Sequence, residues 1–261
     1  MSLLIDELDF DVRRARFCRI AEETAAAART QGEYGFGTLQ EKRLHATLKK
    51  FLCENTDYHE SGIEGTRYLA DVRLGNEIYE VQTGDFAPLK AKLQYLLEHT
   101  PCAVTVVHPF VAQRSVAWID PRDGSLSPAR RTGGIERPID LLPALYPLID
   151  LLPNDRLSFR LLLIAATDFR LLNPSDRRSP KRRTRRYERL PTDLLGDVTF
   201  ASPADFDDLL PAGLPQSFTV PVFSKATGLR GIAAYSAVRV LAKLGLLRQT
   251  STTRPMRFER N

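Results

Sequence analysis

A predicted β-hairpin over residues 67–82, RYLADVRLGNEIYEVQ, constrains the fold of this chain more than any other feature. Its two alternating runs meet at Gly75 and Asn76, and a two-residue connection of this composition favours a tight hairpin turn. In that register Asp71 lies directly opposite Glu80, on one face of the hairpin. Like charges that face each other repel, so the two carboxylates require either solvent or a shared cation such as Mg²⁺.

An amphipathic hairpin with a solvated acidic face would give the same pattern. The residues that follow the hairpin therefore help to distinguish a metal site from a solvated surface. The following helix is predicted to begin near Pro88. Lys92 flanks the apolar stripe of this helix and can reach either water or the acidic face of the hairpin. The stripe itself comprises Leu89, Leu93, Leu96 and Leu97.

An Asp, a hairpin, a Glu-x-Gln sequence at a strand end and a following helix together resemble the PD-(D/E)XK phosphodiesterase superfamily. The resemblance implies an α/β fold of the restriction-endonuclease type, with a mixed sheet flanked by helices. It also implies that Asp71 and Glu80 bind one or two divalent ions, Mg²⁺ or Mn²⁺. Gln82 stands where the superfamily usually has a Lys that positions the attacking water, and Lys92 could restore that charge. Ala70 stands in the place of the motif's Pro.

The resemblance also implies an acid upstream, and Glu41 on the first core helix takes that place. Thr38 and Glu41 form a capping box as well, in which the Glu side chain would return to the backbone N–H of Thr38. Glu41 shares a helical row with Leu44, His45 and Leu48, so its side chain could instead point toward the core. Both roles stay open. His45 is expected to be a structural histidine outside the site.

Several longer segments resemble an uncharacterised prokaryotic family built on the same core. These segments are GTLQEKRLHATLKKF, the hairpin, QTGDFAPLKAKLQYLL and CAVTVVHPF. The match with that family covers most of the chain. The resemblance implies a fold and a site, but it implies no substrate.

Composition limits the partners and the compartment. The formal net charge of +5 favours a polyanionic partner. Cys18, Cys53 and Cys102 lack the spacing of metal ligands, and such usage is typical of a reducing compartment. The N-terminus is acidic where a signal peptide is positive, and the apolar regions 139–153 and 157–166 are interrupted by Pro, Asp or Arg. We therefore expect a cytoplasmic, soluble protein with no membrane partner.

Changes in composition along the chain divide it into four expected parts. These are an N-terminal helical segment (1–32), a nuclease-like core (33–173), a basic linker (174–210) and a winged-helix-like domain (211–261). The N-terminal helix would either cover the core or form the contact of a homodimer.

The expected linker contains the electrostatic centre of the chain. Between Arg177 and Arg189, eight residues are Lys or Arg. Clustered arginines suit phosphate oxygens, and such a segment stays solvated unless a polyanion neutralises it. A basic surface linker that binds no particular partner is the alternative. The candidate nucleic-acid contacts are Arg177, Arg178, Lys181, Arg182, Arg183, Arg185 and Arg186.

The sequence of residues 211–261 predicts a short helix that begins near Phe218 and a turn at Gly228. A longer helix from Gly231 to Leu244 and a basic hairpin are predicted to follow. This order is similar to a small winged helix, in which the longer helix enters a DNA groove. Winged helices also serve protein contacts, and that role stays open. The residues expected to approach DNA are Ser236, Arg239 and Lys243 on the helix, and Arg248, Arg254 and Arg257 on the hairpin.

These parts together indicate a metal-dependent endonuclease that hydrolyses nucleic acid, with DNA as the expected polymer. The alternative is a DNA-binding regulator that uses a catalytically inactive nuclease-like scaffold and a winged helix. An RNA-processing nuclease is a third reading, because a basic segment binds either polymer through its phosphates.

Overall fold

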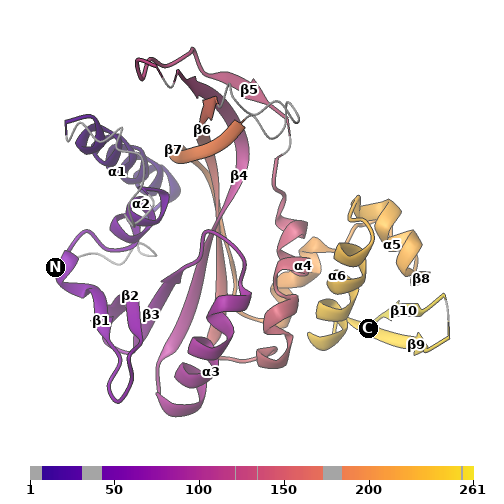
Figure 1. Ribbon diagram of the computed structural model, residues 1–261. Helices are drawn as coiled ribbons and strands as arrows, with labels where there is room; N and C mark the ends of the chain where they lie inside the picture. The colour runs from indigo at the N-terminus through magenta and orange to yellow at the C-terminus, as the bar shows by residue number, and fades with distance from the viewer. Residues whose placement is uncertain (1–7, 31–42, 121, 134, 173–183, 254) are drawn as a thin grey trace. The chain divides into compact units, whose positions relative to one another are not determined.

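The computed structural model describes residues 8–30, 43–120, 122–133, 135–172, 184–253 and 255–261 (Figure 1). The chain is an α/β protein with a mixed seven-stranded sheet of order β1-β2-β3-β4-β6-β7, in which β5 also pairs with β4. This confirms the predicted class of a mixed sheet flanked by helices. The strands are β1 (His59–Gly62), β2 (Leu69–Leu74), β3 (Glu77–Val81), β4 (Ala103–Ile119), β5 (Arg130–Thr132), β6 (Leu157–Leu172) and β7 (Thr184–Phe200).

The helices include six α-helices, and none in the described part of the chain is long and apolar enough to span a membrane. The α-helices are α1 (Phe10–Thr30), α2 (Arg43–Leu52), α3 (Lys90–His99), α4 (Leu141–Ala144), α5 (Val220–Thr227) and α6 (Ile232–Lys243). The 3₁₀ helices are η2 (Thr56–Tyr58), η3 (Ala87–Leu89), η4 (Pro138–Asp140), η5 (Tyr146–Leu151) and η6 (Pro203–Leu209).

The chain divides into two compact units, each assembled from three segments. The first unit comprises Met1–Arg73, His108–Glu136 and Leu162–Asp197. The second unit comprises Leu74–Val107, Arg137–Leu161 and Val198–Asn261.

In the first unit, α1 packs on α2 through aromatic side chains. The rings of Phe17 and Phe51 lie 5.2 Å apart at 84°, an edge-to-face arrangement that adds to the burial of both side chains. Asp9 caps the start of α1, because its Oδ1 accepts a hydrogen bond of 3.0 Å from the backbone N–H of Val12. The hydrophobic face of α2 is therefore covered by a helix from the same chain.

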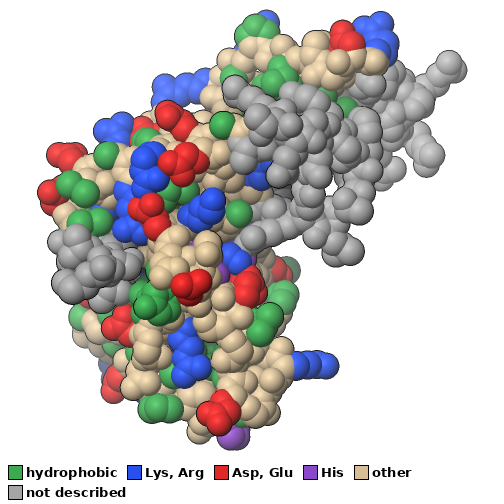
Figure 2. All heavy atoms as spheres, turned by 90° about the vertical axis from the view of Figure 1, so that its left-hand side faces the viewer, with side chains coloured by type: hydrophobic (Ala, Val, Ile, Leu, Met, Phe, Trp, Pro, Cys, Tyr) green, Lys and Arg blue, Asp and Glu red, His purple; other side chains and the backbone are tan. Residues whose placement is uncertain are grey.

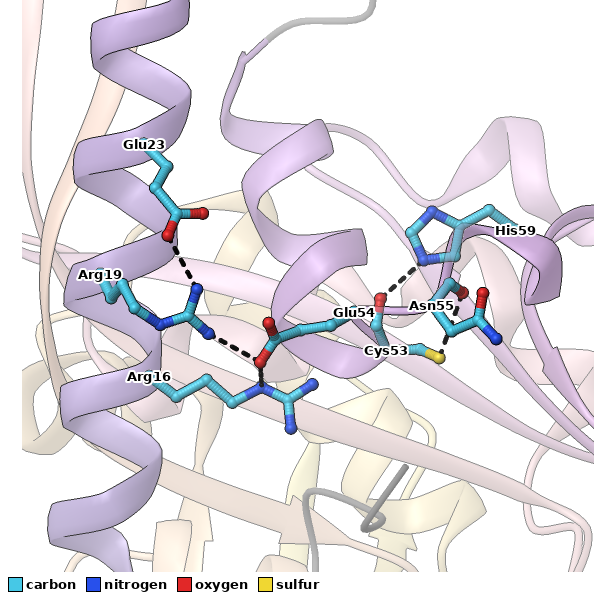
Figure 3. A network of polar contacts seen from close by, with 7 residues as sticks. All are labelled: Arg16, Arg19, Glu23, Cys53, Glu54, Asn55 and His59. Carbon is cyan, nitrogen blue, oxygen red and sulfur yellow. Dashed lines mark hydrogen bonds and ion pairs between the residues drawn. The ribbon is translucent and has the colours of Figure 1, made fainter. Parts of the chain in front are cut away.

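Ion pairs hold α1 to the rest of the first unit. Arg14 donates two hydrogen bonds, of 2.8 and 2.6 Å, to the carboxylate of Asp193 on β7. More generally, Lys and Arg side chains lie among Asp and Glu side chains on the face of the molecule drawn in Figure 2. Arg16 and Arg19 converge on Glu54, which follows α2, at 3.2 and 2.7 Å (Figure 3). Of the two roles predicted for the N-terminal helix, the structure favours covering the core.

Residues 184–200, predicted as part of a linker at 174–210, instead form strand β7 of the sheet. Several of the charged side chains described in this strand have partners elsewhere in the unit. Arg189 donates two hydrogen bonds, of 2.6 and 3.1 Å, to Asp168, which is 1% exposed. Arg43 lies 2.6 Å from Glu188. A segment rich in arginine can therefore form a strand, since carboxylates distant in sequence neutralise it.

Replacing Asp193 with Asn should lower the free energy of unfolding by about 1 kcal/mol at neutral pH, because Arg14 loses a charged acceptor. The Arg14 hydrogen bond holds the pKa of Asp193 below its ordinary value. A depressed pKa stabilises the fold above the pKa of the unfolded chain, and this stabilisation disappears as pH falls through the folded pKa. The free energies of unfolding of the two proteins, measured in urea, should therefore begin to converge as the pH falls below about 4.

Glu23→Gln provides the control for this prediction. Glu23 pairs with Arg19 at 2.8 Å in an exposed position on α1, with side-chain exposures of 53% and 48%. An exposed pair of this kind contributes less than about 0.5 kcal/mol. The same loss at pH 3 and pH 7 for Asp193→Asn would contradict the expected role of its charge.

In the second unit, β3 and part of β4 form a parallel pair, with Glu77 beside Ala103 and Val81 beside Val107. Helix α3 buries Leu93, Leu96 and Leu97, which are three of the four predicted stripe residues. A single long strand, β4, contains most of both apolar runs, CAVTVVH and RSVAWID. Buried Phe110 and Val111 continue the strand between them.

The second unit also contains a three-stranded sheet of order β8-β10-β9, formed by β8 (Ser217–Thr219), β9 (Leu247–Ser251) and β10 (Arg257–Arg260). The predicted hairpin is confirmed, since β9 and β10 pair antiparallel. The ring of Phe218 stacks 6.0 Å from that of Phe223 and 6.5 Å from that of Phe258. Gly228, at φ +77°, ends α5 in a conformation that favours glycine.

Candidate functional site

The predicted hairpin turn is present. Strand β2 ends at Leu74, β3 begins at Glu77, and Gly75 and Asn76 form the connection. Gly75 has φ +64°, a backbone conformation that residues with a side chain adopt only with strain. The local sequence thus specifies a tight reversal. The facing of Asp71 and Glu80, which follows from counting outward from this turn, stays a prediction.

Asp71 belongs to the first unit, in the middle of β2. Its side chain is 16% exposed, and its Oδ2 lies 3.4 Å from Nε2 of His45 on α2. The neighbours of Asp71 along the strand, Ala70 and Val72, are fully buried. The structure therefore brings His45 to one of the predicted metal ligands, although sequence reasoning placed this histidine outside the site.

A second polar pair lies next to Asp71. Lys49, one turn after His45 on α2, is 4% exposed and donates a hydrogen bond to the carboxylate of Glu60 on β1. The antiparallel register of β1 and β2 places Glu60 across from Asp71. Two residues of one helical face thus pair with two acids on adjacent strands. The sequence signal was the four-residue spacing of His45 and Lys49, which puts both on one side of α2.

Glu80 belongs to the second unit, near the end of β3. It is 1% exposed, and its Oε2 lies 2.5 Å from Nζ of Lys92. Helix α3 directs Lys92 to this carboxylate because the neighbouring Leu93 is fully buried and fixes the rotation of the helix. Of the two destinations predicted for Lys92, water and the acidic residue, the structure has the acidic residue. A buried carboxylate is expensive without such a partner.

Gln82 completes the Glu-x-Gln sequence at the end of β3. Its backbone N–H donates to the carbonyl of Val107 at 2.9 Å, which continues the parallel pairing. Its side-chain Nε2 donates to the carbonyl of Asp85 in the loop before α3. Gln82 thus joins the strand end to the loop that leads to Lys92.

Several predicted residues lie outside the described part of the chain. Glu41 is one of them, so its roles as cap or ligand stay predictions. Arg185 and Arg186 lie in β7, but their side chains are not described. The predicted basic contacts outside the described ranges are Arg177, Arg178, Lys181, Arg182, Arg183 and Arg254.

The described residues include donors that suit a divalent ion. Asp71 and Glu80 offer carboxylate oxygens, the donor type that Mg²⁺ and Mn²⁺ prefer. Within the described ranges, no group of three or more His, Cys, Asp or Glu side chains gathers closely enough to hold a metal ion. The third predicted donor, Glu41, falls outside those ranges. Each carboxylate is by itself of the donor type that a hard ion takes, and the binding of one ion by both of them stays a prediction.

The C-terminal candidates differ in accessibility. Ser236 is 5% exposed, so the prediction that it approaches DNA is wrong. Helix α6 packs against α4 and η5, and this packing takes up much of its surface. Arg239 donates to Gln249 Oε1 at 3.1 Å, and Lys243 is exposed. Arg248 lies 2.9 Å from Glu259, which offsets part of its charge.

Residues 42–201 match a family model described as a domain of unknown function, DUF8091. The match spans more than half of the chain. No curated protein and no solved structure shows significant similarity to the chain. Any activity must therefore be argued from the residues themselves.

Proposed function

We propose a metal-dependent phosphodiesterase activity for this chain, which belongs to the DUF8091 family. The proposed reaction is endonucleolytic hydrolysis of nucleic acid, with DNA as the expected polymer. Asp71 and Glu80 would hold Mg²⁺ or Mn²⁺, and Glu41 would be the upstream acid. The seven-stranded sheet would then be a nuclease core of the restriction-endonuclease type, in agreement with the resemblance to the PD-(D/E)XK superfamily.

The buried pair of Glu80 and Lys92 carries this proposal. The superfamily pattern requires a positive group near the second acid, and Gln82 occupies the usual position of that group. Lys92 supplies an ammonium 2.5 Å from Glu80 from the following helix. Because an apolar pair of similar volume would stabilise a fold as well or better, a buried ion pair at this position supports a chemical role.

Each residue has a distinct task in the proposed site. A divalent ion held by the two carboxylates would supply polarisation of the phosphate and a more acidic water. His45 fixes the side chain of Asp71, and Lys92 fixes that of Glu80. Lys92 also places positive charge where a phosphate would gain negative charge in the transition state. Gln82 holds the loop between the strand and α3.

The C-terminal part supports binding to DNA. Two helices joined by a short turn and followed by a β-hairpin have the order of a winged helix. We propose that α6, with Arg239 and Lys243, and the β9–β10 hairpin, with Arg248, contact DNA. The basic segment that precedes β7 would add phosphate contacts. The free cysteines support a reducing, cytoplasmic location.

The proposal is tested with the wild-type chain on supercoiled DNA, single-stranded DNA and RNA, each with Mg²⁺, Mn²⁺ or EDTA. We expect cleavage of DNA with either metal and none in EDTA, because the proposed water requires the ion. Cleavage of RNA alone would keep the chemistry and change the polymer. The absence of metal-dependent cleavage from every substrate would contradict the proposal.

A regulator without catalytic activity is the second candidate. Gln82 favours it, because this residue lacks the charge of the usual Lys and its side chain is bonded to Asp85. Tight, sequence-selective DNA binding without turnover in any metal would support the regulator. Binding and cleavage measured on the same oligonucleotides therefore separate the two candidates.

A further inference from the structure

Three arginines lie where β4 pairs with β5, and we call them the basic arm: Arg114 on β4, and Arg130 and Arg131 on β5. Strand β5 pairs antiparallel with β4, with Arg131 beside Ser115 and Arg130 beside Val116 (Figure 1). All three residues of β5 are exposed. The arm lies within the first unit, and it is separate from the basic residues discussed above.

Neutral acceptors orient two of these guanidinium groups. Arg114 donates to Thr132 Oγ1 at 3.3 Å and to the carbonyl of Gly133 at 2.6 Å. Arg131 donates to Gln113 Oε1 at 2.5 Å. These bonds fix the direction of the side chains without cancelling their charge. Among the described residues, no carboxylate lies within ion-pair distance of the arm's arginines.

Several other arginines of the first unit are neutralised by carboxylates. Arg122, in the loop between the two strands of the arm, lies 2.8 Å from Asp120 and donates to both of its carboxylate oxygens. The arginines of α1 that bind Asp193 and Glu54 are also paired. Arg114 and Arg131 of the arm differ from these arginines, because their guanidinium groups are oriented by neutral acceptors and have no carboxylate partner among the described residues.

A planar guanidinium presents a fork of donors that matches two oxygens of a phosphate. A two-stranded ribbon that projects several such groups is suited to a chain of phosphates. Charged residues on an edge strand can also serve only to prevent pairing with another sheet. That role requires charge, but it does not require that the side chains be held in fixed directions.

We propose that the basic arm binds the phosphate backbone of DNA. The choice of DNA rests on the proposed function, whereas the site itself rests on the uncompensated arginines. The arm adds a contact surface to the first unit that is independent of the C-terminal helices. It would hold the substrate without taking part in the chemical step.

The test compares the double variant Arg130→Gln/Arg131→Gln with Arg122→Gln by fluorescence anisotropy on a DNA duplex. EDTA is present throughout, so that binding is measured without cleavage. We expect the double variant to bind the duplex on the order of tenfold more weakly than wild type. The slope of log affinity against log salt concentration should become shallower by about 2, because two phosphate contacts are lost. Arg122→Gln should bind like wild type, because Asp120 already offsets its charge.

An unchanged DNA affinity and salt slope in the double variant would overturn the proposal that the arm binds DNA. Equal weakening by Arg122→Gln would also overturn it, because net charge alone would then explain the loss. If the double variant binds DNA as tightly as wild type and still cleaves it, the arm proposal fails and the proposed function stands. A failure of the wild-type protein to bind DNA in these conditions would also contradict the proposal that the arm binds DNA. The phosphodiesterase activity is tested separately by the cleavage assay. Thermal unfolding of each variant verifies that the fold is retained.

Discussion

Replacing Lys92 with Met is expected to lower the free energy of unfolding by about 3 kcal/mol or more, because the carboxylate of Glu80 then stays buried without its ammonium partner. Glu80 is 1% exposed, and it cannot turn to water without disrupting β3. Methionine retains most of the length and volume of the lysine stem, so the change reports mainly on charge. Urea unfolding at neutral pH measures the difference.

Lys90→Met is the matched control on the same helix. Lys90 lies 2.5 Å from Asp150, but the two side chains are 39% and 72% exposed. Solvent screens such a pair, so its loss should cost less than about 1 kcal/mol. Equal losses for the two variants would contradict a buried, desolvated pair at Lys92.

The double variant Glu80→Gln/Lys92→Met separates stability from chemistry. Removing both charges eliminates the uncompensated buried carboxylate, so most of the lost stability should return. If the pair has only a structural role, activity should return with stability. The proposed function requires that the double variant be stable and inactive.

Local features of the sequence predicted the hairpin and the helices that carry the candidate site. The turn was predictable because Gly75 provides a backbone conformation that few residues share. The rotation of α3 was predictable because buried leucines recur at helical spacing. The consequence for Lys92, its contact with Glu80, was one of two outcomes that this pattern allowed.

Contacts between distant residues explain what the sequence did not reveal. Strand β7 looked like a linker because its arginines meet their partners only in the folded chain, as Arg189 meets Asp168. His45 looked structural because its approach to Asp71 depends on how α2 packs over β2. Ser236 looked accessible because helical periodicity does not show that α6 has partners on more than one side.

The charge of the basic arm was also hidden in the sequence. Residues 121–138 contain Pro, Gly and Ser beside their arginines, a composition typical of a loop. The pairing of β5 with β4 brings Arg130 and Arg131 to the strand that carries Arg114. Whether an arginine is neutralised depends on the tertiary position of the nearest carboxylate, as the contrast with Arg122 demonstrates.

Asp71→Asn is expected to reduce metal-dependent DNA cleavage by at least about a hundredfold, because the amide has the shape of the carboxylate but lacks its charge for the ion. DNA affinity in EDTA should stay unchanged, since the proposed DNA contacts lie elsewhere. Glu80→Gln should have the same effect on cleavage. Single-turnover rates with Mg²⁺ measure both variants against wild type.

The most direct measurement is the cleavage rate of wild type and Asp71→Asn, purified in parallel and assayed on one DNA substrate in Mg²⁺ and in EDTA. The variant must first match wild type in thermal unfolding and in DNA binding. The account predicts cleavage by wild type in Mg²⁺ only, and almost none by Asp71→Asn. A folded, DNA-binding Asp71→Asn that cleaves at the full wild-type rate would contradict the assignment of Asp71 as a metal ligand.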